Sequence, residues 1–429
     1  MLNVFNILKY NKIKKACKFQ EKVLDFDMSS LDKEICEFAE NIYKKNKNKF
    51  NKFTNHNNKI GFLASTLYDT GGHTPCIINL THSMLESEKN ILLLSKIKQS
   101  QKKAPKAMKK LENYCYLTGV EYNAFNFTDT LIKGYNKLIN DLPRVIFLYL
   151  AQHDIYSTAL VYLLKKNTNT KFIFANHASH FPNLAMTLAD VILEGGALST
   201  KITNEKRKLF NTKIVGIQSK KEGETKYYSK EELLKIRQSL DIEKNDLMTI
   251  SGGASYKFFE NNKSEYFEMI KKMLIAKKDL KHVIMSNLNK DQEDIINKIF
   301  EDKELRKRLI ILPLSPDYEK FFQASDLYID SFPISSALTQ VDMMRLKVPS
   351  VVKINTKNPE WSFYEYMPPK YPYMFEKVEE LFSSIIDLLE NKEKRDEIVK
   401  SNYEFWLQNW ELNAYKKNID KIINEVIND

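Results

Sequence analysis

The sequence has few cysteines and no long hydrophobic run. Cys17, Cys36, Cys76 and Cys115 lie far apart in the chain, which disfavours both a disulfide framework and a zinc ribbon. No apolar stretch approaches the about 18 residues that a membrane-spanning helix requires. Residues 1–22 are rich in lysine and lack the apolar block and small-residue cleavage site of a secretory signal. We therefore expect a cytoplasmic protein.

The excess of positive charge is confined to one end of the chain. The sequence has 66 Lys and Arg against 55 Asp and Glu, a formal net charge of +11. Residues 1–60 carry 13 lysines and 7 acids, and residues 96–110 carry 7 lysines and no acid, whereas residues 111–429 carry 45 residues of each sign. A basic region of this kind favours docking on an anionic glycan or on the inner face of an anionic membrane. Nucleic acid is the rival partner and is not expected, because aromatic residues for base stacking are sparse in residues 96–110.

Short apolar runs alternate with helical patterns along most of the chain. This rhythm predicts an α/β protein, and 429 residues suffice for two domains or sometimes three. We expect buried parallel strands at 60–65, 91–94, 145–150, 171–175 and 191–194, and again at 247–251, 282–286, 309–313, 327–330 and 350–354. The predicted division is a basic, mainly helical leader at 1–59, an N-terminal domain at 60–205, an interdomain passage at 206–246, a C-terminal domain at 247–375 and C-terminal helices at 376–429.

Two doubly wound, Rossmann-like domains that face each other would bind a ligand in the cleft at the carboxyl ends of their strands. In the C-terminal domain, a strand ends at Asp330, and Ser335, Ser336 and Thr339 then open a helix. The N–H groups of a helix start, with hydroxyls beside them, can bind a phosphate or diphosphate. Asp342, three residues after Thr339, could accept from a ribose hydroxyl. The alternative interpretation is an ordinary helix whose Ser335 or Ser336 is only an N-cap.

A Gly-Gly loop follows the first strand of the same domain. Gly252 and Gly253 permit a ligand to approach the backbone closely, Ser255 follows them, and Lys257 could neutralise a leaving diphosphate. A plain strand-to-helix turn with a solvated lysine is the alternative.

The N-terminal domain has a comparable first loop, in which Gly72, His73 and Thr74 precede Pro75. His73 would lie beside a helix N-terminus, where it can stay neutral and act as a general base, or it is simply a buried structural histidine.

Asn176, His177 and His180 follow another predicted strand of this domain. The H-x-x-H pair suggests a metal, but no Cys, Asp or Glu lies within seven residues of it, so no metal is expected. Together with His73 and His153, these histidines fall at strand ends or in the loops that follow, which favours a solvated cleft.

Taken in order, these segments resemble GT-B glycosyltransferases, in particular the branch of O-linked N-acetylglucosamine transferase and the bacterial cytoplasmic N-glycosyltransferases. The donor half of that branch aligns without a gap at Asp330, Thr339, Asp342, Pro349 and Val351, and its diphosphate-contacting Tyr-Lys aligns with Tyr256-Lys257. The acceptor half is similar at Gly72-His73-Thr74-Pro75. The stretch from Asn176 to Phe181 is similar to one in bacterial surface-glycan transferases.

The resemblance implies a metal-independent hexosyl- or N-acetylhexosaminyl-transferase without a cofactor. It would move a sugar from a nucleotide-diphosphate donor, UDP-linked, to a glycan, glycolipid or protein acceptor in bacterial surface-glycan or glycoconjugate synthesis. His73 and Lys257 would be catalytic. Gly252, Gly253, Ser255, Ser335, Ser336, Thr339 and Asp342 would bind the nucleotide sugar, and Gly72, Thr74, His153, Asn176, His177 and His180 would line the acceptor side. A non-catalytic scaffold of the same fold is the alternative, because Ala337 and Leu338 stand where the family has polar groups.

Overall fold

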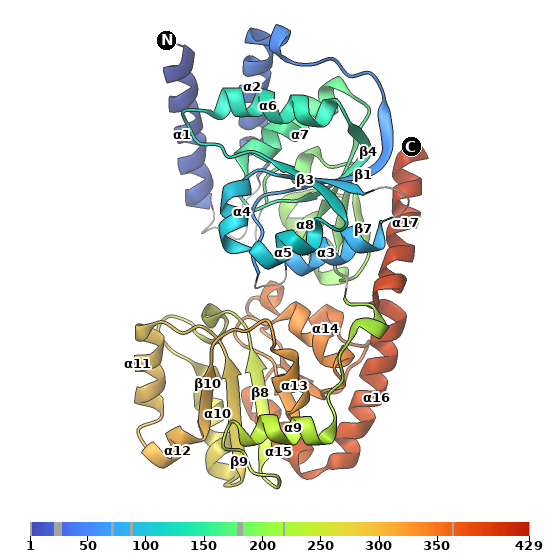
Figure 1. Cartoon of the computed structure of the whole chain (residues 1–429). Helices are drawn as coiled ribbons and strands as arrows, with labels where there is room; N and C mark the ends of the chain where they lie inside the picture. The colour runs from blue at the N-terminus through green and yellow to red at the C-terminus, as the bar shows by residue number, and fades with distance from the viewer. Residues whose placement is uncertain are drawn as a thin grey trace. The chain divides into compact units, whose positions relative to one another are not determined.

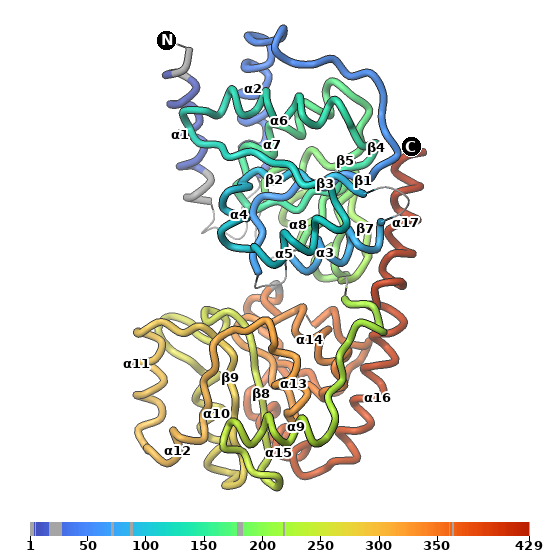
Figure 2. The backbone as a smooth tube through the Cα atoms, in the orientation of Figure 1, coloured from blue at the N-terminus to red at the C-terminus, as the bar shows by residue number. Residues whose placement is uncertain are grey.

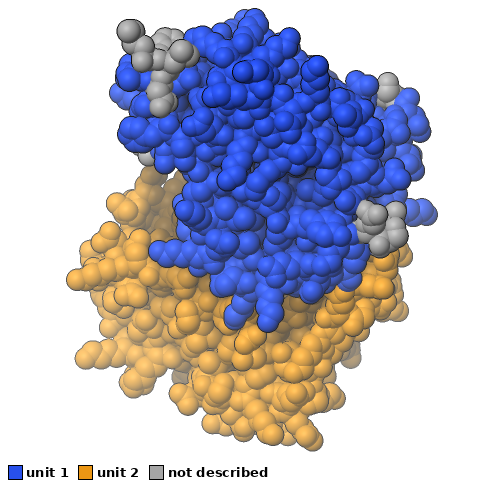
Figure 3. All heavy atoms as spheres, turned by 45° about the horizontal axis from the view of Figure 1, so that its top comes forward, with its two compact units in different colours: residues 1–216, 415–429 blue, residues 217–414 orange. Residues whose placement is uncertain are grey.

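The computed structural model describes residues 2–20, 28–69, 73–85, 89–177, 183–217, 219–362 and 364–428. The chain forms two compact units: unit 1 comprises Met1–Gly216 with Tyr415–Asp429, and unit 2 comprises Ile217–Ala414 (Figure 3). The boundary after Gly216 falls within residues 206–246, the segment that the sequence predicts as the interdomain passage. Each unit is built on its own parallel sheet.

Unit 1 contains a sheet whose seven strands follow the order β3-β2-β1-β4-β5-β6-β7. Its strands are β1 (His56–Ala64), β2 (Asn90–Leu94), β3 (Cys115–Gly119), β4 (Leu142–Tyr149), β5 (Lys171–Ala175), β6 (Val191–Glu194) and β7 (Thr212–Ile214). Parallel strands need crossover connections, and the helices that make them cover both faces of the sheet (Figure 1). Accordingly all five residues of β2, which reads Asn-Ile-Leu-Leu-Leu, are buried.

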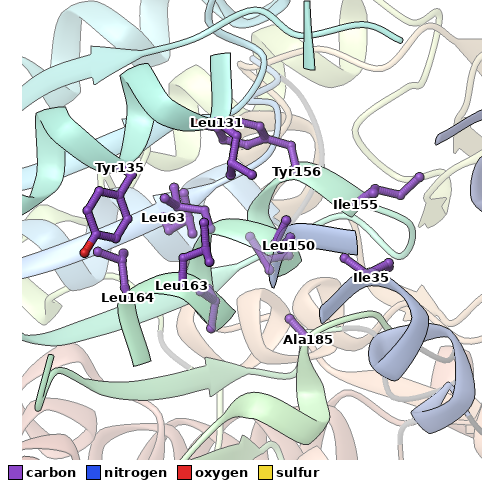
Figure 4. Packing of buried hydrophobic residues seen from close by; sticks show 14 of the residues in the cluster. Ile35, Leu63, Leu131, Tyr135, Leu150, Ile155, Tyr156, Leu163, Leu164 and Ala185 are labelled. Atoms are coloured by element: carbon purple, nitrogen blue, oxygen red, sulfur yellow. The ribbon is translucent and has the colours of Figure 1, made fainter. Parts of the chain in front are cut away.

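The helices of unit 1 are α1 (Leu2–Gln20), α2 (Ser29–Lys45), α3 (His73–Ser83), α4 (Ile97–Lys103), α5 (Pro105–Leu111), α6 (Phe127–Ile139), α7 (Ile155–Asn167) and α8 (Ala197–Arg207). Leu63 of β1 packs with Leu131 and Tyr135 of α6 and with Leu163 of α7 in the main core of this unit (Figure 4). Ile35 of α2 joins the same core and is fully buried.

The first two helices therefore belong to unit 1, which differs from the separate leader predicted for residues 1–59. The physical reason is the apolar face of α2, which buries Leu31, Ile35 and Phe38. The buried Asp32 on the same helix accepts hydrogen bonds from the Ala185 N–H at 2.8 Å and the Thr187 hydroxyl at 2.6 Å. A helix tied to the domain by both kinds of contact cannot behave as an independent leader.

Unit 2 contains a sheet whose six strands follow the order β10-β9-β8-β11-β12-β13. Its strands are β8 (Leu247–Gly252), β9 (Leu280–Met285), β10 (Leu309–Leu312), β11 (Leu327–Ile329), β12 (Ser350–Lys353) and β13 (Met374–Phe375). Its helices are α9 (Lys230–Gln238), α10 (Glu265–Ala276), α11 (Lys290–Ile299), α12 (Lys303–Lys307), α13 (Glu319–Gln323), α14 (Ala337–Arg345), α15 (Val378–Glu390) and α16 (Lys392–Asn409). Trp406 of α16 is fully buried in the core of this unit.

The last helix, α17 (Leu412–Asn428), begins in unit 2 and continues into unit 1, as the tube in Figure 2 traces. In unit 1, Lys213 of β7 forms an ion pair with Glu425 of α17 at 3.1 Å. The predicted C-terminal helical segment is therefore shared between the units. None of the helices in the described parts of the chain combines the length and apolarity that a bilayer crossing requires.

Candidate functional site

Two loops of unit 2 meet at the carboxyl ends of β8 and β11. The first carries Gly252, Gly253 and a 3₁₀ turn, η4 (Ser255–Phe258), and the second runs from Asp330 to the start of α14. The Lys257 ammonium joins them, because Nζ donates to the Ser335 carbonyl oxygen at 2.9 Å and to Ser336 Oγ at 3.2 Å. The two segments that the sequence singles out separately in this domain thus form one cluster.

Both glycines of the first loop are needed for this close approach. A Cβ atom at position 252 would lie 2.7 Å from Cζ of Phe322, and one at position 253 would lie 2.8 Å from Ser336 Oγ. These distances are shorter than a carbon atom tolerates. Any larger residue at 253 would therefore push the first loop away from the start of α14.

Ser336 is the N-cap residue of α14, but its side chain makes no capping hydrogen bond. Its hydroxyl instead contacts Ser331 Oγ at 3.0 Å, the Gly252 carbonyl at 3.3 Å and the Lys257 ammonium. The plain N-cap interpretation of Ser336 is therefore wrong. The first N–H groups of any helix lack intrahelical acceptors and carry partial positive charge, so the start of α14 and Lys257 together provide a positive electrostatic environment.

Asp330 organises this loop and was not among the predicted site residues. The residue is 1% exposed. Its carboxylate accepts from the Tyr328 hydroxyl at 2.9 Å, the Ser335 hydroxyl at 2.5 Å, the Ser336 N–H at 3.1 Å and the Gln340 amide at 2.6 Å. Burial raises the pKa of Asp330, and these donors and Lys257 oppose that rise.

Lys257 has an unusual environment for a lysine. Burial lowers its pKa from 10.5 to about 8, while the charge of Asp330 acts in the opposite direction. The ammonium form therefore still predominates at pH 7, yet the proton is held weakly enough to be lost in mildly alkaline solution.

The other predicted residues of unit 2 lie around this cluster. The Asp342 carboxylate already accepts from the Tyr318 hydroxyl at 2.7 Å and from Arg345 Nη2 at 2.7 Å, so its proposed bond to a ribose would be an additional one and stays a prediction. The Thr339 hydroxyl hydrogen-bonds to Tyr328. Ser255 opens η4 and is half-buried.

Unit 1 brings two predicted histidines together at the carboxyl ends of β4 and β5. His73 is the first residue of α3, and the centroids of its ring and the His177 ring are 4.4 Å apart. Tyr149, the last residue of β4, lies beside both rings, with centroids 5.9 Å from His73 and 6.4 Å from His177. Gly72 and His180 lie outside the described residues.

The hydrogen-bonding state of each histidine follows from its neighbours. His177 Nδ1 lies 3.3 Å from the Ala175 carbonyl oxygen, which can only accept, so Nδ1 carries the proton and Nε2 of the neutral ring keeps its lone pair. His73 Nε2 is buried and has no hydrogen-bond partner among the described residues. Burial, and secondly the nearby His177, lower the pKa of His73 well below its ordinary value. His73 is therefore neutral at pH 7 and able to accept a proton.

Asn176 is positioned by a carboxylate that the sequence did not reveal as important. Glu194, the last residue of β6, is fully buried and accepts from Asn176 Nδ2 at 2.9 and 3.1 Å and from the Thr203 hydroxyl at 2.6 Å. Thr74 is also buried, and its hydroxyl accepts from the Tyr68 N–H at 2.8 Å. His153 lies half-buried in the loop after β4. Within the described ranges, no group of three or more His, Cys, Asp and Glu side chains could hold a metal ion.

The sequence matches no family model and no curated protein, but solved structures match most of its length. Anabaena HepE in complex with UDP is 14% identical, with 86% of this chain and 100% of that chain covered and a TM-score of 0.66. A glycosyltransferase from Rickettsia africae is 12% identical, with 87% and 99% covered and a TM-score of 0.68. Thermobaculum terrenum O-GlcNAc transferase is 9% identical, with 95% and 75% covered and a TM-score of 0.56.

These similarities establish the fold of the chain. The two parallel, helix-covered sheets are those of GT-B glycosyltransferases, so the predicted GT-B fold with two doubly wound domains is confirmed. The cluster around Lys257 occupies the carboxyl ends of the second sheet, and the cluster around His73 and His177 occupies those of the first.

Proposed function

We propose that the protein is a glycosyltransferase that transfers a sugar from a nucleotide-diphosphate sugar, UDP-linked, to an acceptor bound by unit 1. The observation that carries this proposal is the Lys257 ammonium fixed on Ser335 and Ser336 at the start of α14, beside a loop that only glycines allow to come so close. An ammonium and a helix N-terminus at the carboxyl ends of parallel strands suit a diphosphate. The GT-B fold supports the same conclusion, since structures of HepE hold UDP and UDP-glucose.

The chemistry would use the two units for different tasks. The bond between the anomeric carbon and the diphosphate oxygen breaks, and Lys257 with the α14 N-terminus stabilises the negative charge that develops on the departing diphosphate. The acceptor oxygen forms the new bond to the anomeric carbon. Its proton passes to Nε2 of His73, which is neutral at pH 7 because its pKa is lowered.

The finer assignments are part of the same proposal. Charge stabilisation by Lys257 and α14 would make a divalent metal unnecessary, so activity should persist in EDTA. The acceptor would be a glycan, glycolipid or protein in bacterial surface-glycan or glycoconjugate synthesis, and the sugar a hexose or N-acetylhexosamine.

The test is a screen of UDP-, GDP-, CMP- and ADP-sugars for nucleotide release, combined with calorimetry of UDP binding. We expect UDP to bind, Lys257→Met to weaken binding at least tenfold, and Lys272→Met, which removes an exposed lysine from α10, to leave binding unchanged. Binding of no nucleotide at millimolar concentration would overturn the proposal in favour of a non-catalytic scaffold.

A further inference from the structure

The two lysine-rich segments of the sequence form one surface of unit 1. Unit 1 carries 35 basic and 21 acidic residues, whereas unit 2 carries 31 and 34, so the whole net charge of the protein lies on unit 1. The exposed lysines of α1, α4 and α5 contribute much of this excess; they are Lys12, Lys14, Lys15, Lys98, Lys102, Lys103, Lys106, Lys109 and Lys110. We call these nine side chains the basic surface.

Aromatic contacts hold α1 next to the start of α4. The Tyr10 ring of α1 meets the Tyr122 ring edge-on, with centroids 6.4 Å apart, and the ammonium of Lys96, directly before α4, lies 3.6 Å from the centroid of Tyr122. The charge of Lys14 in turn contributes to lowering the pKa of Lys96, after the larger effect of burial. Segments about 80 residues apart in sequence, seen on the same side of unit 1 in Figure 1, thus place their lysines together.

The basic surface is largely uncompensated. Of its nine lysines, only Lys12 forms an ion pair with a described carboxylate, Glu34, at 3.6 Å. The carboxylate nearest to α5 in the hydrogen-bond pattern, Asp69, is occupied otherwise, since it accepts from the backbone N–H of Ala107 at 2.9 Å. Concentrated, unpaired ammonium groups create a field that attracts an extended anionic partner.

The exposed face of α1 adds apolar side chains to this charge. Val4 and Leu8 are 59% and 64% exposed, and together with Lys12 and Lys15 they follow each other at helical spacing along one stripe. The opposite face buries Tyr10 and Ile13. Aliphatic side chains next to lysines on one helix face suit the boundary between lipid headgroups and acyl chains, and they offer nothing to a polyanion in solution.

From these observations we propose that unit 1 docks on an anionic membrane surface through the basic surface, with Val4 and Leu8 of α1 entering the headgroup region. The partner is a bilayer that exposes anionic phospholipid headgroups. The docking itself is independent of the proposed transferase activity.

The position of the basic surface relative to the acceptor loop has a consequence that does rest on the proposed function. The loop after β1, which leads towards His73, is bonded to α4 and α5: the Leu67 N–H donates to Ser100 Oγ at 3.0 Å, and the Asp69 N–H donates to the Lys103 carbonyl at 3.1 Å. A bilayer bound at α4 and α5 would therefore lie close to the loop that leads to the proposed acceptor site, which favours a lipid-linked acceptor.

The test is cosedimentation of the full chain with vesicles of phosphatidylglycerol and phosphatidylcholine in equal parts, and with vesicles of phosphatidylcholine alone. We expect binding to the anionic vesicles only. Each lysine near such a surface contributes about fivefold to partitioning, so exchanging Lys102, Lys103, Lys109 and Lys110 for Gln should lower it on the order of a hundredfold. The matched control exchanges four exposed lysines of unit 2, Lys272, Lys278, Lys290 and Lys298, for Gln and should bind as the unaltered protein does.

A second variant tests the apolar contribution without changing the charge. Val4→Gln with Leu8→Gln should remove the part of the binding that persists at high salt, where charge interactions are screened. Circular dichroism confirms that each variant is folded. Undiminished vesicle binding in the four-lysine variant would overturn the proposal, and so would equally tight binding to duplex DNA or to a soluble sulfated glycan, which would indicate a general polyanion site.

Discussion

Lys257 is the residue whose protonation state bears most directly on the proposed binding of a diphosphate. Its pKa of about 8 means that the ammonium is lost as the pH rises from 7 to 9. Because the charged form binds the diphosphate, we expect UDP affinity to fall about tenfold over this interval. In Lys257→Arg the cation persists, so the decline should disappear even if affinity is lower overall. Calorimetry at both pH values measures this, and an unchanged slope in Lys257→Arg would show that another group titrates.

His177 is expected to control the basicity of His73. Burial and the adjacent His177 both lower the pKa of His73, and replacing His177 by Gln weakens the second of these effects. The pKa of His73 should rise, and the acid limb of kcat/KM, below which the base is protonated, should move to higher pH. His82→Gln, at the far end of α3, serves as the control. A limb that stays in place would remove His73 from the role of general base.

At the scale of single residues, the sequence indicated the groups that can meet a ligand but not those that position them. Lys257, Ser336 and His73 were found because they follow predicted strands, where the ends of parallel sheets gather side chains. Asp330 and Glu194 were not chosen as site residues because a buried carboxylate acquires its role from partners elsewhere in the sequence, such as Thr203 for Glu194. Spacing within one segment contains no information on those partners.

At the scale of elements, a buried chain of hydrogen bonds connects β8, β9, α10 and β11 in unit 2. Ser251 Oγ donates to the Ile329 carbonyl at 2.5 Å, and the Tyr266 hydroxyl donates to Ser251 Oγ at 2.6 Å. The single Tyr266 proton is then used, so His282 Nε2 must donate to Tyr266 at 2.8 Å and Nδ1 must accept from Thr249 at 2.8 Å. This pattern requires a neutral imidazole.

The stability of unit 2 should consequently fall in mild acid. Burial lowers the pKa of His282 to about 3, so below its unfolded value of 6.5 the unfolded chain binds a proton that the folded chain refuses. Between pH 7 and pH 5 the loss should be about 2 kcal/mol, and it should be absent from the pH dependence of His282→Gln.

All three tryptophans, Trp361, Trp406 and Trp410, lie in unit 2, so urea titrations followed by tryptophan fluorescence measure this unit separately. His282→Gln should be less stable than the unaltered protein at pH 7, since Gln cannot reproduce both bonds. His82→Gln in unit 1 is the control and should retain the full pH dependence. Equal slopes in His282→Gln and the unaltered protein would contradict the assignment.

The strands of both sheets could be predicted from the sequence where they are apolar and buried on both faces. β3 and β13 were missed because β3 is an edge strand with exposed Tyr116 and β13 has only two residues. The end of α14 shows the opposite case, in which backbone geometry persists although the residue differs. Lys347 stands where the family has Gly, and its φ of 59° is the left-handed conformation that glycine favours there. Its ammonium lies 4.2 Å from the Tyr403 ring centroid, which supplies a contact that glycine lacks.

At the scale of the whole molecule, the two proposed activities are assigned to different units. The residues proposed for the nucleotide sugar all lie in Ile217–Ala414, which is continuous in sequence and has hydrophobic cores of its own. The basic surface lies entirely in unit 1. The sequence predicted this separation of charge along the chain, but not that α1 and α4 would place their lysines on one surface, because that depends on the contact between Tyr10 and Tyr122.

This separation predicts the behaviour of unit 2 produced alone as residues 217–414. We expect it to fold, because its sheet and its cores contain no residue of unit 1, and to bind UDP with the same decline between pH 7 and pH 9 as the full chain. With 31 basic and 34 acidic residues, it should not sediment with anionic vesicles. Lys257→Met in the isolated unit is the control for specific UDP binding. A folded unit 2 that binds vesicles would contradict the proposed docking surface, and one that is folded but binds no UDP would mean that unit 1 supplies essential nucleotide contacts.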